Sequence, residues 1–160
     1  MKGFTASFFN VAELSIDFYQ KALKQQETAE WLVGYALAKT RHNFGRLGAV
    51  RNEMEIIWRQ AIERDPTYSF AKLKLADALL ANRGDEGKEE IENLIEEVQS
   101  LESSVEKEEN ILLKETMADL WRKTRPEDDT KGLKLFLECY NSDHKRAKTL
   151  RGLRYILKNG

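Results

Sequence analysis

The 160-residue sequence is poor in the residues that cross-link or interrupt a fold. It has one cysteine, Cys139, so no disulfide forms within the chain, and the position of Cys139 in a helical pattern favours a small packed residue over a catalytic thiol. Two prolines, Pro66 and Pro126, leave long stretches free to form helices. No apolar run approaches the roughly 20 residues that span a bilayer. The N-terminus lacks a signal-peptide pattern, and we therefore expect a soluble, cytoplasmic protein with no membrane contact.

The residues that carry most enzyme chemistry are also scarce or scattered. The two histidines, His42 and His144, have no neighbour in sequence that would orient a catalytic base. No glycine-rich phosphate loop and no zinc-ligand spacing occurs. The many glutamates of residues 85–115 are spread round a helix, whereas a metal site needs converging oxygens. The sequence therefore predicts a protein that is not an enzyme and has no cofactor and no metal site.

The formal net charge of −1 hides a strong sorting of charges along the chain. Residues 1–84 hold 12 basic and 9 acidic side chains, residues 85–115 hold 3 and 12, and residues 116–160 hold 11 and 6. The segment 144–160 contains six Lys or Arg and no acid. Sorted charges of this kind either form a polar binding surface or keep exposed helices in solution, and net charge does not decide between the two.

Two interleaved series of small residues run through the sequence with one period. An aromatic or branched residue precedes a small residue by three positions four times, and these small residues are 39, 37 and 41 positions apart. Between them lies a second series, Ala36, Ala76 and Ala118, spaced 40 and 42 apart. Such a pattern indicates a repeated pair of helices, each pair too small to bury its apolar face alone. The first series comprises Tyr19 and Ala22, Trp58 and Ala61, Ile95 and Val98, and Phe136 and Cys139.

Helical periodicity covers almost the whole chain, and no strand-like alternation of useful length occurs. The breaks between helices are short, so consecutive helices are expected to be antiparallel neighbours. We therefore predict an all-α fold, a right-handed α-solenoid of antiparallel helix pairs, as a single domain over residues 1–160. The expected helices, eight in number, span residues 7–25, 28–41, 48–64, 68–83, 86–102, 106–124, 129–141 and 144–158.

The same series predict the core and one surface that the fold leaves open. The first helix has more apolar side chains than one neighbouring helix would cover: Phe4, Phe8, Phe9, Val11, Leu14, Ile16, Phe18 and Tyr19. We therefore expect a homo-oligomer or attachment to further repeats. The residues expected to be buried are Ala36, Trp58, Ala61, Leu75, Ala76, Leu79, Ala118, Trp121 and Phe136.

The helix pairs resemble the tetratricopeptide repeat. Trp58 to Pro66 is similar to the second helix and closing proline of that motif, and Ser69 to Leu80 is similar to the next first helix. The insertion around Asn43–Val50 makes the repeats longer than usual, a pattern that resembles the interferon-induced proteins with tetratricopeptide repeats. The stretches Glu30–Arg41, Gln60–Pro66, Leu94–Val98 and Met117–Lys123 carry this resemblance, over about residues 12–158. The last helix departs from it, since His144 replaces the usual proline and Arg154 the usual small residue.

The resemblance implies an antiviral protein of innate immunity that binds single-stranded RNA with 5′ phosphates in a basic tunnel or groove. Arg41 matches a basic pocket residue of the RNA-binding members. The first helices of the later pairs carry arginines and a tyrosine. An arginine suits phosphate because its guanidinium donates two hydrogen bonds, and a tyrosine ring can stack on an unpaired base. Glu115 and Asp119, expected on the same surface, would limit its positive field. The candidate RNA-binding residues are Arg41, Arg122, Lys148, Arg151, Tyr155 and Lys158.

Alternative interpretations remain open at this point. The candidate residues also suit solvated helix faces and C-terminal charges favoured by the helix dipole. Helical repeats most often form scaffolds that bind proteins through their groove, and a self-associating structural piece is a third class. Leu73 and Asp77 occupy the places where chaperone-binding repeats hold a peptide carboxylate, which disfavours that partner. The sequence leaves open RNA against protein as the ligand, the RNA end chemistry, the oligomeric state and whether the chain is a fragment.

Overall fold

The computed structural model describes the backbone of residues 2–43, 46, 48, 50–101, 107–128, 130–142 and 147–159. It describes the side chains of residues 11–43, 46, 48, 50–101, 111–128, 130–142 and 149–156. Within these ranges the chain forms eight α-helices and one short 3-10 helix, and no strand. The all-α prediction of about eight helices is confirmed.

The helices lie close to the predicted ranges. The largest difference is at the N-terminus, where the first helix begins at Lys2 instead of residue 7. The third helix was expected to begin at residue 48 but begins at Arg51, so Val50 lies before the helix. The helices are α1 (Lys2–Gln25), α2 (Ala29–His42), α3 (Arg51–Arg64), α4 (Ser69–Arg83), η2 (Gly84–Gly87), α5 (Lys88–Leu101), α6 (Lys107–Thr124), α7 (Thr130–Ser142) and α8 (Ala147–Asn159).

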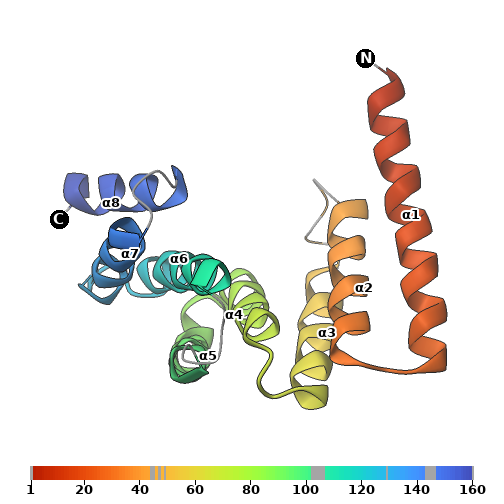
Figure 1. Cartoon of the computed structure of the whole chain (residues 1–160), viewed down its shortest axis with the longest axis horizontal. Helices are drawn as coiled ribbons and strands as arrows, with labels where there is room; N and C mark the ends of the chain where they lie inside the picture. The colour runs from red at the N-terminus through yellow and green to blue at the C-terminus, as the bar shows by residue number, and fades with distance from the viewer. Residues whose placement is uncertain are drawn as a thin grey trace. The chain divides into compact units, whose positions relative to one another are not determined.

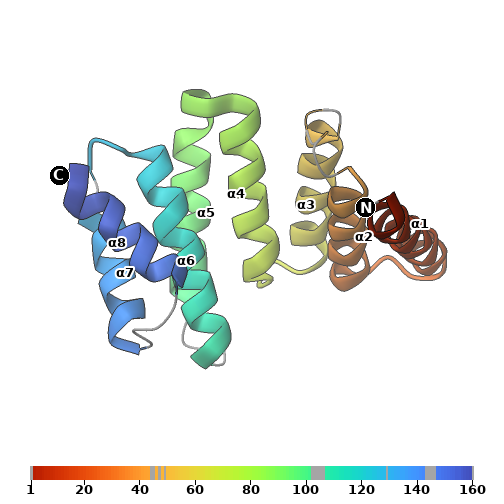
Figure 2. The ribbon, with the colours of Figure 1, turned by 90° about the horizontal axis from the view of Figure 1, so that it is seen from above.

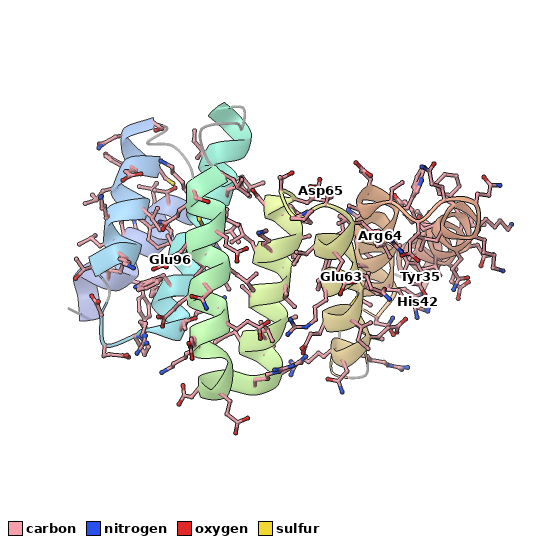
Figure 3. The ribbon with its side chains drawn as sticks, turned by 90° about the horizontal axis from the view of Figure 1, so that it is seen from below. Tyr35, His42, Glu63, Arg64, Asp65 and Glu96 are labelled. Atoms are coloured by element: carbon pink, nitrogen blue, oxygen red, sulfur yellow. The ribbon has the colours of Figure 1, made fainter. Side chains whose placement is uncertain are left out.

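Local chemistry explains where these helices start and stop. The Thr28 hydroxyl accepts a hydrogen bond from the backbone N–H of Trp31 at 3.3 Å and so caps α2. At the end of α3, Asp65 adopts an extended backbone before Pro66, because proline disfavours the helical region for its predecessor. Figure 3 labels Asp65 at this turn between α3 and α4. After α4, Gly84 has a φ of 54°, which suits glycine and ends the helix.

The chain divides into two compact units, residues 1–82 and 83–160. In unit 1, α2 packs against both α1 and α3, and these three helices run alternately down and up in Figure 1. The α4 helix is tied to α3 by hydrogen bonds from Arg51 Nη1 to the Ala81 carbonyl (3.3 Å) and from Asn82 Nδ2 to Glu55 Oε2 (3.1 Å). The expected single domain over the whole chain stays a prediction.

In unit 2, α6 packs against α5 and α7, and α8 lies against both α6 and α7 (Figure 2). Successive helices thus stack on one another in each unit, as in an α-solenoid. Ion pairs join the neighbours at their surfaces, for example Lys114 Nζ of α6 to Glu138 Oε2 of α7 at 2.8 Å. This stacking places residues from α6, α7 and α8 beside one another at one end of the unit.

The small-residue series forms the contacts between helices. The side chains of Ala36, Ala61, Ala76 and Ala118 are wholly buried. At the α6–α7 contact, a Cβ atom on Gly132 would lie 3.3 Å from the Ala118 carbonyl oxygen, which shows how closely the two backbones approach. All nine residues expected in the core are buried, namely Ala36, Trp58, Ala61, Leu75, Ala76, Leu79, Ala118, Trp121 and Phe136.

Candidate functional site

Unit 2 contains a hollow of about 390 Å³ where α6, α7 and α8 meet. Three of the residues predicted to bind RNA, Arg122, Arg151 and Tyr155, line it together. Arg122 belongs to α6, and the other two are one helical turn apart on α8. Here this space is called the basic hollow. Its lining is Asp119, Arg122, Phe136, Arg151, Gly152 and Tyr155.

Arg122 is held in a fixed orientation by two neighbours. Its Nη2 atom donates a hydrogen bond to Asp119 Oδ1 at 2.8 Å, and its guanidinium carbon lies 4.3 Å from the centroid of the Tyr155 ring. The guanidinium therefore stacks on the ring, a geometry that arginine favours. The Nε atom of Arg122 is buried with no hydrogen-bond partner among the described residues.

Asp119 shares its carboxylate between two cations. Its Oδ2 atom pairs with Lys123 Nζ at 2.8 Å while Oδ1 accepts from Arg122. Burial raises the pKa of Asp119, but the hydrogen bonds from Lys123 and Arg122 outweigh it, and the pKa lies below its ordinary value. Asp119 is thus ionised near neutral pH, and one negative charge faces Arg122, Lys123 and the nearby Arg151. The lining of the basic hollow thus includes two arginines and one carboxylate.

Glu115 does not lie on the open surface, where the sequence predicted it. Its side chain is almost wholly buried, and its Oε1 atom accepts hydrogen bonds from the backbone N–H of Thr149 (3.1 Å) and from the Thr149 hydroxyl. Thr149 is the third residue of α8, whose first backbone N–H groups lack partners within the helix. Glu115 therefore caps α8 from α6 and fixes the helix that carries Arg151 and Tyr155.

The other predicted site residues are placed differently. Arg41 is exposed on α2 and lines a separate hollow of about 290 Å³ between α1 and α2, together with Tyr19 and Gly34. Arg41 is not part of the basic hollow. Lys148 and Lys158 lie on α8, but their side chains fall outside the described part of the chain. His144 lies outside the described residues altogether.

A second hollow, here called the α2–α4 hollow, lies in unit 1 and has mostly apolar walls. It has a volume of about 310 Å³, is open to solvent, and is lined by residues of α2, α3 and α4 and by Val50. Asp77 is exposed at this hollow, whereas Leu73 is buried in the core. An aspartate here disfavours a bound carboxylate, in line with the sequence. The lining is Leu37, Thr40, Val50, Arg51, Met54, Trp58, Lys74, Asp77, Ala78 and Ala81.

The described side chains include no group of three or more His, Cys, Asp or Glu placed to hold a metal ion. Among the described residues, no helix combines the length and the apolar character needed to cross a membrane. Cys139 is buried, and its sulfur lies 3.7 Å from the Ile111 carbonyl oxygen. Trp121 is buried in the core as well, and its indole N–H donates a hydrogen bond to the Asp128 carbonyl at 3.2 Å.

Comparison of the chain with protein-family models, with curated proteins and with solved structures finds no match.

Proposed function

We propose that this protein is a non-enzymatic RNA-binding module that holds phosphates of single-stranded RNA at the basic hollow of unit 2. The observation that carries the proposal is the stacked pair of Arg122 and Tyr155 beside Arg151, in one hollow. The resemblance to interferon-induced proteins with tetratricopeptide repeats supports the same ligand. It extends the proposal to a cytoplasmic protein of antiviral defence.

The chemistry of the hollow suits a phosphate next to an unpaired base. Arg151 is exposed at the hollow, and Arg122 keeps N–H groups beyond the one that Asp119 accepts, so guanidinium groups from both helices border the place that a phosphate would take. The Tyr155 ring is half exposed, which leaves part of it open to stack with a base. Because Asp119 offsets part of the charge, we expect weak to moderate affinity that comes mainly from the RNA backbone.

The experiment measures the affinity for 5′-triphosphate and 5′-hydroxyl single-stranded RNA of the same sequence. Arg151→Glu should weaken binding of all sequences alike by about tenfold or more, since it places a negative charge in the hollow. Arg154→Glu is the matched control, because Arg154 is exposed on the same helix but does not line the hollow. If both variants lost the same affinity for RNA, the overall charge of α8 would account for binding, and the hollow would have no part in it.

A second candidate function is a scaffold that binds a protein segment, and the α2–α4 hollow favours it. Met54, Trp58 and Ala81 offer an apolar wall, with Lys74 and Asp77 as charged groups of opposite sign beside it. Such a wall suits an apolar side chain of an extended or helical segment. The scaffold interpretation replaces RNA binding if no salt-sensitive RNA affinity exists and a peptide ligand is found whose binding Ala81→Arg abolishes.

A further inference from the structure

The outer face of α1 carries a row of large apolar side chains that are more than half exposed, although one side of the Phe18 ring meets Trp31 of α2, with ring centroids 5.8 Å apart. Ala12 on the inner side of α1 is buried, and the Tyr19 ring lies against Gly34 of α2. On the other side, Val11, Leu14 and Phe18 are 61%, 70% and 57% exposed. At about 100° per residue these three side chains fall within an arc of about 60°, so they form one stripe along the helix. This is the excess apolar surface that the sequence predicts for the first helix.

The repeat register shows how unusual this exposure is. Phe18 directly precedes Tyr19 in α1. The residues at the same place of the repeat in α3, α5 and α7 are Ile57, Leu94 and Leu135, and all three are buried. Leu14 stands four residues earlier, where α3, α5 and α7 have the charged residues Glu53, Glu90 and Lys131. The outer face of α1 is therefore both largely exposed and more apolar than its place in the repeat requires. A stripe of this kind marks a contact surface.

Charged residues beside the stripe follow a self-complementary order. Glu13 and Asp17 occupy the earlier turns and Lys21 and Lys24 the later ones, all four exposed and within an arc of about 80°. None of the four forms an ion pair within the described part of the chain. When two copies of such a helix lie antiparallel, the acidic half of each faces the basic half of the other.

We propose that α1 is the interface of a two-fold symmetric homodimer, in which the α1 helices of two copies pack antiparallel about Phe18. This register sets Leu14 against the partner's Ala22, a large side chain against a small one, and brings Glu13 and Asp17 near the partner's Lys24 and Lys21. Two-fold dimers are the commonest closed assemblies, and each copy presents the same surface. The inference is independent of RNA binding, since no residue of the basic hollow takes part.

Sedimentation equilibrium over a range of concentrations tests the dimer with the whole chain. The parent protein should dimerise reversibly, and Phe18→Glu should raise the dimer dissociation constant by about tenfold or more. The matched control is Ile56→Glu on α3, because Ile56 is 58% exposed, as Phe18 is, and lies outside the stripe. Its dissociation constant should equal that of the parent. Leu14→Gln, at the most exposed position of the stripe, is a second variant that leaves the packing of α1 on α2 intact and should weaken the dimer in the same direction.

Charge reversal tests which partner α1 takes. Lys21→Glu with Lys24→Glu makes the charged strip wholly acidic, and Glu13→Lys with Asp17→Lys makes it wholly basic. Each double variant should be monomeric by itself, and an equimolar mixture should form a heterodimer. An unchanged dimer in Phe18→Glu, or a mixture that stays monomeric, would overturn the proposal. So would a parent protein that stays monomeric and instead binds the helix of another protein.

Oxidative cross-linking tests the antiparallel register. A mixture of Leu14→Cys and Ala22→Cys proteins should give disulfide-linked dimers in higher yield than either variant alone. The parent, whose Cys139 is buried, is the control and should not cross-link. Preferential cross-linking of Leu14→Cys to itself would show a different register and contradict the arrangement about Phe18.

Discussion

The ring of Phe136 on α7 lies so close to Gly152 on α8 that a Cβ atom on the glycine would stand 2.3 Å from the ring. The same relationship joins Tyr19 of α1 to Gly34 of α2, where the distance would be 2.2 Å. Phe136 and Tyr19 hold the same position in the repeat, three residues before a small one. Two aromatic rings thus pack on glycines at equivalent places of the two units.

Gly152→Ala should destabilise the protein, because the added methyl group displaces the Phe136 ring from a packed site. Overpacking of this kind costs about 1–3 kcal/mol, which exceeds the gain of about 1 kcal/mol that alanine brings to a helix. Urea unfolding measures the change. Gly48→Ala is the control, since a Cβ atom there would meet no atom of the described residues within 4 Å, its chain neighbours aside. A stabilised Gly152→Ala protein would contradict the close contact.

Trp58→Ala should lower the free energy of unfolding by about 3–5 kcal/mol through the cavity that it leaves. The Trp58 side chain is buried and meets the edge of the Phe70 ring, with a centroid distance of 6.4 Å. Thermal and urea unfolding give the value. A loss comparable to that of an exposed residue would mean that the contact between α3 and α4 is not part of the core.

Glu115→Ala should loosen α8, because the backbone N–H and the hydroxyl of Thr149 lose their common acceptor. An unsatisfied buried polar group costs about 1–3 kcal/mol. In the variant, the amides of α8 should exchange hydrogen faster than they do in the parent, while those of α5 should exchange at the parent's rate. RNA affinity should fall as well. Glu63→Ala, at an exposed glutamate of α3, should leave both quantities unchanged. Unchanged exchange in α8 would show that Glu115 does not hold this helix.

The stability that Asp119 contributes should depend on pH in the acid range. Its pKa in the folded protein lies below the ordinary 3.8, so its contribution is fully present above that value and is lost as pH falls through the lower folded-state pKa. Asp119→Asn should remove this part of the pH dependence, which urea unfolding at a series of acid pH values measures. An identical pH profile for the parent and the variant would contradict the pairing with Arg122 and Lys123.

The sequence predicted the helices and the core because both depend on local periodicity. A small residue every 37 to 42 positions, with a bulky residue near it, is enough to place Ala36, Ala61, Ala76 and Ala118 at helix contacts. The exposed stripe of α1 followed from the same periodicity. The side chains of Phe4, Phe8 and Phe9, which were part of that expectation, lie outside the described ones.

The basic hollow was predicted only in part, because its geometry depends on contacts between distant residues. Arg122 and Tyr155 are 33 positions apart, and nothing in their local sequence shows that the ring lies under the guanidinium. Glu115 was expected to face the groove, whereas a bond to Thr149, 34 positions later, buries it. A buried carboxylate at a helix start has a faint sequence signal, namely a lone acid among the apolar residues Leu113 and Met117.

The most direct test of the account is the salt dependence of binding to 5′-triphosphate single-stranded RNA, measured for the parent and for Arg151→Glu. Each phosphate contact with a cation contributes about 0.7 to the slope of log affinity against log salt for a single strand. We predict a clear negative slope for the parent that becomes shallower in Arg151→Glu, while Glu96→Gln in the acidic α5 leaves it unchanged. A parent protein without salt-sensitive affinity at micromolar concentration, or an Arg151→Glu slope equal to that of the parent, would contradict RNA binding at the basic hollow.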